Sequence, residues 1–232
     1  MTTQAPSALV IGASRGLGLG LAREYLKRGW NVVATVRGTR PTGLHELAGT
    51  ADGRLEIEQL DINDQGQTAA LRERLSARRF DVVFVNAGVI DDRAQSIGEV
   101  STDEFVRVMV TNALSPMRVV EALQDLVPPT GTVAVMSSGL GSVAGNESGG
   151  YEVYRGSKAA LNTLMRSFAA RHANDPRSFL VIAPGWVRTD MGGADAGLDV
   201  ETSIAGVVDT LAAQSGRPGL SYLNYQGKTV NW

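Results

Sequence analysis

The chain has 232 residues, of which 43% are hydrophobic and 20% are charged, and its formal net charge is −2. This composition is typical of a globular protein, and the small net charge argues against a nucleic-acid or anionic-membrane partner. The chain has no cysteine, which excludes disulfides, thiolate zinc sites and a cysteine nucleophile.

The first segment, residues 1–7, is polar and lacks the basic-then-apolar order of a signal peptide. No later apolar run reaches the length of about 18 residues that a membrane-spanning helix needs. We therefore expect a cytoplasmic protein without a membrane span.

Short β-branched runs then alternate with longer segments of helical periodicity. Six runs are predicted to be buried strands: Ala8–Ile11, Asn31–Val36, Leu55–Leu60, Asp81–Val85, Thr132–Met136 and Phe179–Ala183. Leu17, Leu21 and Tyr25 share one face of a helix after the first strand, and a last helix is predicted near Glu201–Ala213. The alternation is typical of parallel βαβ units. We expect one doubly wound α/β domain over residues 1–232, with a mostly parallel sheet of about seven strands.

A glycine-rich turn joins the first strand to the first helix. Its candidate cofactor-binding residues are Gly12, Ser14, Arg15, Gly16, Leu17 and Gly18. Glycine is favoured in such a turn because a side chain would block the pyrophosphate of a dinucleotide, and the N-terminus of the helix offers N–H groups to phosphate. The turn predicts a dinucleotide site, although a glycine-rich turn without a ligand would have the same composition.

The residue after the second strand bears on which dinucleotide binds. Enzymes that prefer NAD usually carry an acid there, which binds the ribose 2′-hydroxyl. This chain has Arg37 instead, and Arg15 lies in the glycine turn. Two cations suit a 2′-phosphate, so we predict NADP(H) as the preferred cofactor and NAD(H) as the second choice. The alternative is that both arginines are solvated surface residues.

A tyrosine and a lysine four residues apart, Tyr154 and Lys158, share one face of a predicted helix. A free phenol has a pKa of about 10, and a nearby ammonium lowers that pKa by favouring the phenolate. A tyrosine tuned in this way can donate a proton to a carbonyl oxygen as hydride arrives, or accept one in the reverse reaction. Such a pair also arises by chance on half-exposed helices. Its place after the fifth strand and the glycine-rich loop Gly139–Gly150 favours the catalytic interpretation.

The fifth strand ends in two serines, Ser137 and Ser138. Ligands of open α/β sheets bind at the carboxyl ends of the strands. A serine hydroxyl there can hold the substrate carbonyl or hydroxyl beside the tyrosine.

Together these motifs resemble the short-chain dehydrogenase/reductase family. The resemblance rests on the Gly-x3-Gly-x-Gly spacing of the turn and on Tyr154-x3-Lys158. It implies a Rossmann fold and an NAD(P)-dependent oxidoreductase. It also implies that Ser138 is the catalytic serine, that Asn112 relays protons through a bound water to the lysine, and that Lys158 holds the nicotinamide ribose.

The resemblance also implies cofactor contacts outside the turn. Asp61 and Ile62, after the third strand, correspond to the position that contacts the adenine ring. Further cofactor-binding positions follow the fourth and sixth strands: Asn86, Ala87, Gly88, Pro184, Gly185, Val187 and Thr189. With these, the similarity covers nearly the whole chain.

Within the family the chain most resembles the C-factor and sniffer-type carbonyl reductases. The shared features include Val36-Arg37, the long loop between Ser138 and Tyr154, and the segment 227–232. The resemblance implies NADPH-dependent reduction of a small-molecule carbonyl or oxidation of an alcohol. In many relatives the helices around residues 105–127 and 154–173 pair subunits, so we expect a homodimer or homotetramer.

Two other functions stay open. A catalytically silent NADP(H)-binding sensor or regulatory protein would keep the fold but would not need Ser138, Tyr154 and Lys158. A methyltransferase that uses S-adenosylmethionine would explain the glycine turn but neither the Tyr–Lys pair nor the segment 184–189. The histidines show no metal-ligand spacing, so we expect no metal. The physiological substrate and the direction of the reaction do not follow from the sequence.

Overall fold

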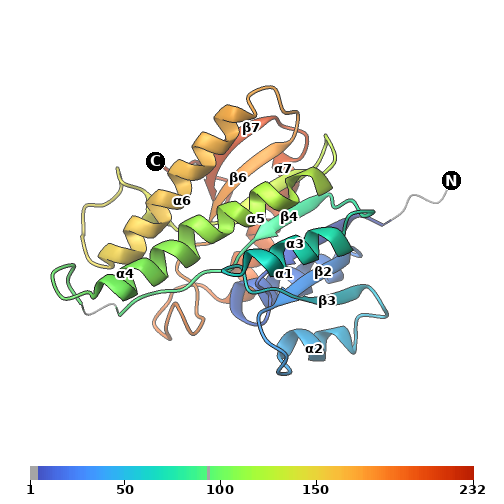
Figure 1. The fold of residues 1–232 in the computed structure, drawn as a ribbon, viewed down its shortest axis with the longest axis horizontal. Coiled ribbons are helices and arrows are strands. Elements are labelled where there is room, and N and C mark those ends of the chain that lie inside the picture. The colour runs from blue at the N-terminus through green and yellow to red at the C-terminus, as the bar shows by residue number, and fades with distance from the viewer. Residues whose placement is uncertain (1–4, 93–94) are drawn as a thin grey trace.

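Seven parallel strands form one sheet in the order β3-β2-β1-β4-β5-β6-β7 (Figure 1). The strands of this computed structural model are β1 (Ser7–Ile11), β2 (Asn31–Val36), β3 (Leu55–Gln59), β4 (Val82–Val85), β5 (Thr132–Met136), β6 (Ser178–Ala183) and β7 (Gly219–Asn224). The strand order reverses between β1 and β4, and dinucleotides bind at the carboxyl ends of the strands at such a switch point. The predicted sheet is confirmed, and the six predicted runs match observed strands to within one residue at each end. The seventh strand, β7, was not located from the sequence.

The structure describes residues 5–92 and 95–232. The first four residues of the polar segment 1–7, which we predicted not to be a signal peptide, lie outside the described residues. Within the described residues, no helix combines the length and the apolar character needed to cross a membrane.

Helices cover both faces of the sheet. They are α1 (Gly16–Lys27), α2 (Gly43–Ala48), α3 (Gln65–Arg74), α4 (Thr102–Met109), α5 (Ser115–Leu123), α6 (Glu152–Arg171) and α7 (Val200–Gln214), with the short turns η1 (Val110–Leu114), η2 (Gln124–Leu126) and η3 (Gly139–Gly141). α1, α2 and α7 share one buried core with the sheet, and α3, α5 and α6 share the other. The predicted doubly wound architecture is therefore confirmed.

The strands contribute side chains to both cores in alternation. In β1, Leu9 and Ile11 pack toward α3, α5 and α6, whereas Ala8 and Val10 pack toward α1 and α7. A strand that is buried on both faces is apolar at nearly every position, which is why runs such as β1 and β4 could be recognised in the sequence.

One buried hydroxyl in the α1 core lacks a hydrogen bond. The side chain of Tyr25 is 1% exposed and packs against Trp30, with ring centroids 4.7 Å apart. Its hydroxyl has no partner among the described residues, and burial raises its pKa far above the usual value. A buried polar group without a partner costs about 1–3 kcal/mol.

We therefore expect Tyr25→Phe to raise the free energy of unfolding by about 1 kcal/mol. Urea denaturation of the two proteins measures the difference, and circular dichroism checks that the fold is unchanged. A loss of stability on this substitution would mean that the hydroxyl does have a partner.

Candidate active site

The glycine turn between β1 and α1 leaves no room for side chains. Gly12 has a φ of +84°, and a Cβ there would lie 2.8 Å from the Cβ of Ala87. A Cβ on Gly18 would lie 2.1 Å from the carbonyl oxygen of Gly12. The other predicted residues of the turn are half-buried or exposed: Ser14, Arg15, Gly16 and Leu17. Bare backbone and the unpaired N–H groups at the start of α1 together fit the pyrophosphate of a dinucleotide.

The segment after β4 connects the glycine turn to the predicted catalytic residues. Asn86 donates from Nδ2 to the carbonyl of Gly12 at 2.8 Å, and the N–H of Ala87 donates to the carbonyl of Ile11 at 3.2 Å. At Gly88, an added Cβ would lie 3.4 Å from Nζ of Lys158. The predicted residues of this segment, Asn86, Ala87 and Gly88, therefore lie between the glycine turn and Lys158.

The residues predicted for the adenosine half lie at the carboxyl ends of β2 and β3. Arg37 is exposed directly after β2, and Ile62 is buried after β3. The carboxylate of Asp61 accepts a hydrogen bond from the N–H of Asn63 at 3.0 Å. Arg15 donates to the carboxylate of Asp190 at 2.8 Å, in a pair that is about three-quarters exposed on both sides. An exposed ion pair contributes little free energy, so a phosphate can replace Asp190 as the partner.

The segment after β6 turns back toward the glycine turn. Gly185 has a φ of +86°, and a Cβ there would lie 2.6 Å from Cδ1 of Leu198. The carbonyl of Pro184 accepts a hydrogen bond from the hydroxyl of Ser203 at 2.7 Å. Val187 is buried and forms a bridge with Leu198. These contacts fix the backbone that the sequence predicts to contact the nicotinamide.

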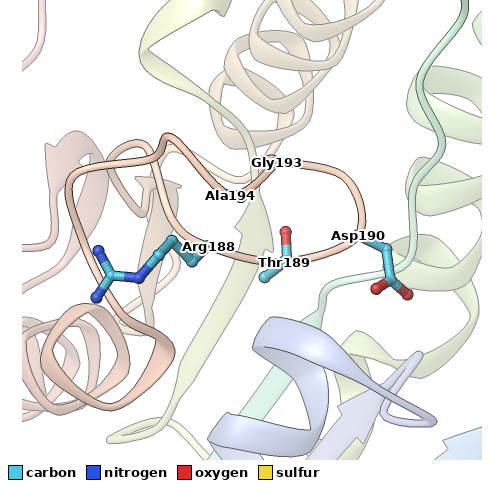
Figure 2. A pocket seen from close by; sticks show the side chains of 5 residues that line it. All are labelled: Arg188, Thr189, Asp190, Gly193 and Ala194. Carbon is cyan, nitrogen blue, oxygen red and sulfur yellow. The ribbon is translucent and has the colours of Figure 1, made fainter.

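Thr189 lies against the glycine turn. A Cβ on Gly16 would lie 3.6 Å from Cγ2 of Thr189, and the threonine hydroxyl accepts a hydrogen bond from the N–H of Gly192 at 2.9 Å. A pocket of about 400 Å³ lies here. It is lined by Arg188, Thr189, Asp190, Gly193 and Ala194 (Figure 2). The contact between Gly16 and Thr189 thus brings the glycine turn against the segment after β6, although the two are far apart in sequence.

Tyr154 and Lys158 lie together on α6, as their spacing predicts. The side chains are 8% and 3% exposed, and Nζ of Lys158 lies 5.8 Å from the centre of the Tyr154 ring. The ammonium donates to the carbonyl of Met136, at the end of β5, at 2.9 Å. Burial lowers the pKa of Lys158 to about 8, because the charged form loses its hydration. The phenol of Tyr154 therefore lies beside Lys158, which loses its charge as the pH rises through about 8.

The two serines at the end of β5 differ in their surroundings. Ser137 is buried, and its hydroxyl donates to Oδ1 of Asn162 at 2.6 Å. The hydroxyl of half-buried Ser138 accepts a hydrogen bond from the N–H of Leu140 at 3.1 Å. Its proton is still available for a ligand. This difference favours Ser138 as the serine that meets a substrate.

Asn112 does not lie in an ordinary α-helix. It is in η1, a π-helical turn between α4 and α5, and turns of this kind are frequent at functional sites. Its Oδ1 accepts from the N–H of Val89 at 2.7 Å, and its Nδ2 donates to the carbonyl of Val89 at 2.8 Å and to the hydroxyl of Ser157 at 2.9 Å. The side chain is therefore occupied in holding the segment after β4 against α6.

Two buried polar residues near Ser138 were not predicted. Asn162 lies four residues after Lys158, so the spacing that identified the Tyr–Lys pair could also have identified it. Tyr222 lies on β7, the strand that the sequence did not reveal.

Comparisons with known proteins agree with this geometry. A family model described as enoyl-(acyl carrier protein) reductase matches residues 12–216. A protein from Burkholderia multivorans, described as a short-chain dehydrogenase/reductase with bound NADP, is 60% identical and superposes with a TM-score of 0.97 over 99% of this chain and 100% of that one.

Two relatives bear on the sub-group. The carbonyl reductase Sniffer of D. melanogaster is 30% identical, with a TM-score of 0.89 over 99% of this chain and 100% of that one. C-signal of Myxococcus xanthus is 35% identical over 154 residues, which are 66% of this chain and 92% of C-signal. The predicted similarity to these types is confirmed, and the chain belongs to the short-chain dehydrogenase/reductase family of oxidoreductases.

Proposed function

We propose that the protein transfers hydride between NADP(H) and the carbonyl carbon of a small molecule, with Tyr154 as the general acid and base. The observation that carries the proposal is the buried ammonium of Lys158 beside the Tyr154 ring, at the edge of the sheet where the glycine turn opens. The bound cofactor supplies or accepts the hydride. The experiment that tests the proposal is oxidation of NADPH in the presence of a panel of aldehydes and ketones.

Each residue has a separate part in this proposal. The hydroxyl of Ser138 donates to the substrate carbonyl and orients it. Tyr154 donates the proton to the same oxygen, and Lys158 lowers the pKa of the phenol and holds the nicotinamide ribose. The relay assigned to Asn112 runs through its main-chain oxygen, because its side chain already makes three hydrogen bonds.

The preference for NADP(H) rests on charge at the adenosine end. Arg37 and Arg15 are exposed cations at the carboxyl ends of β2 and β1, and the relative from Burkholderia multivorans binds NADP. In a calorimetric titration we expect NADPH to bind at least about tenfold tighter than NADH, which is about 1.4 kcal/mol.

We expect Arg37→Ala to remove most of that preference by weakening NADPH and leaving NADH unchanged. Arg217→Ala is the matched control, because Arg217 is an exposed arginine at the amino end of β7, on the opposite edge of the sheet. Equal affinities for NADH and NADPH in the unaltered protein would mean that Arg37 is only a solvated surface residue. The search for a substrate would then begin with the oxidation of alcohols by NAD.

The proposed homo-oligomer has support on one outer face. Phe105 on α4, Leu114 in η1 and Leu164 on α6 are large hydrophobic residues, each about 40% exposed. α4 and α6 pack against each other, so these side chains lie near one another. Because they are exposed, a second copy of the chain could bind to them. Either a homodimer or a homotetramer would cover them.

A further inference from the structure

Buried polar groups hold the backbone on both sides of Ser138. The hydroxyl of Tyr222 donates to the carbonyl of Ser138, and the N–H of Gly141 donates to the same oxygen at 2.9 Å. Asn162 accepts the hydroxyl of Ser137 at 2.6 Å and donates from Nδ2 to the carbonyl of Gly141 at 3.1 Å. Residues on either side of Ser138, and its own carbonyl, are thus fixed by two side chains from other elements.

We call this pair, Asn162 and Tyr222, the serine bracket. Both residues are 2% exposed. Buried polar groups are costly unless they are paired, and a satisfied buried network holds one arrangement of the backbone. Asn162 continues the row of Tyr154 and Lys158 along one face of α6, so the helix that carries the catalytic pair also fixes the serine.

The ring of Trp232 packs against Tyr222 and helps to hold it in place. The Trp232 ring packs on the Tyr222 ring with centroids 5.2 Å apart, and the Arg166 guanidinium lies 4.7 Å from the centre of the Trp232 ring. The N–H of Ala144 donates to the main-chain oxygen of Trp232 at 3.0 Å. The segment around Trp232 therefore holds both the bracket tyrosine and the loop that follows Ser138.

We infer that Asn162 and Tyr222 are positioning residues, which set the place of the Ser138 hydroxyl relative to Tyr154. The inference rests on the proposed function, because it gives Ser138 a role in orienting the substrate. Ser138 lies between the end of β5 and the turn η3. Asn162 and Tyr222 hold the backbone on both sides of it through the hydrogen bonds described above. A displacement of about 1 Å in a reacting group can cost roughly 100-fold in rate, so loss of a bracket contact is expected to lower turnover.

Tyr222→Phe tests the inference, because it keeps the ring on Trp232 and deletes one hydroxyl. We expect kcat to fall about tenfold or more, with little change in KM or in the Kd of NADPH. Tyr25→Phe is the matched control, since it deletes another buried tyrosine hydroxyl in the core on the other face of the sheet. That variant should keep the wild-type kcat.

A double-mutant cycle separates positioning from a general effect on the fold. If Tyr222 acts through Ser138, Tyr222→Phe will cause no further loss of kcat in a Ser138→Ala background. The same fold-loss in both backgrounds would overturn the inference. Full turnover in Ser138→Ala alone would instead contradict the part of the proposed function that concerns the serine.

Hydrogen exchange supplies a readout that needs no turnover. The amides of Leu140 and Gly141 donate to the hydroxyl and the carbonyl of Ser138, so their exchange reports how firmly the serine is held. We expect faster exchange over residues 139–141 in Tyr222→Phe than in the wild type or in Tyr25→Phe. Unchanged exchange would overturn the inference, and this test does not require a known carbonyl substrate.

Discussion

Tyr154→Phe is expected to lower kcat by about 10³-fold and to leave the affinity for NADPH close to the wild-type value. The substitution removes the O–H that transfers its proton to the substrate oxygen and keeps a ring of the same shape at a position where Tyr154 is only 8% exposed. Hydride can still be delivered, but the oxyanion that forms no longer receives a proton from the protein. Stopped-flow or steady-state oxidation of NADPH gives kcat, and calorimetry gives the affinity.

Tyr151 offers a matched comparison for this experiment. It precedes α6 in the left-handed region, with a φ of 53°, and the residue four positions later is Arg155 rather than a lysine. Tyr151→Phe should keep kcat within a few-fold of the wild type. If Tyr154→Phe kept its turnover, the assignment of the general acid would be wrong. If the wild type bound NADPH but turned over no carbonyl, the silent sensor would become the better description.

The strands could be predicted because burial on both faces leaves a simple pattern. Every residue of β4 and β5 is buried, so each strand reads as an unbroken run of β-branched and other small or apolar residues. β7 lies at the edge of the sheet, only its Tyr222 and Leu223 are buried, and its Gly219 and Ser221 interrupt the apolar run. No continuous apolar segment marks such a strand, which explains why it was missed.

The candidate site was predictable where its chemistry is local in sequence. Tyr154 and Lys158 are one helical turn apart, and the glycine turn is a single short segment. Contacts between distant segments left no such signal. The pairing of Arg15 with Asp190 joins residues 175 positions apart, and the bond from Tyr222 to Ser138 spans 84.

The π-helical turn at Asn112 could not be predicted for a different reason. Its formation changes the hydrogen bonding of the helix by one residue, whereas the spacing of the apolar residues on either side still fits an α-helix. The sequence placed Asn112 on a helix but did not indicate the π-helical turn or the hydrogen bonds that its side chain makes.

Lys158→Met is expected to abolish turnover and at the same time to stabilise the protein at neutral pH. The pKa of Lys158 falls from the usual value of 10.5 to about 8 on burial, so the folded protein holds this proton less tightly than the unfolded chain does. Because each pKa unit corresponds to about 1.4 kcal/mol, the charged lysine costs the folded state roughly 3 kcal/mol below pH 8. Methionine removes that cost but leaves the carbonyl of Met136 without its donor, at about 1 kcal/mol. The net gain at pH 7 is about 1–3 kcal/mol.

The pH dependence of this gain distinguishes a buried charge from a simple packing effect. Between pH 8 and pH 10.5 the folded lysine is largely neutral while the unfolded one is still protonated, so the unfolded state binds more protons. In that window the contribution of Lys158 to wild-type stability therefore rises with pH, and the advantage of the methionine variant should shrink. Urea unfolding of both proteins at pH 7 and near pH 10 measures the change. A difference that stayed constant with pH would mean that the pKa of Lys158 is the same in the folded and unfolded states, so that burial does not destabilise its charge. In that case a fall of the reductase rate as the pH rises through 8 could not be assigned to the loss of this ammonium.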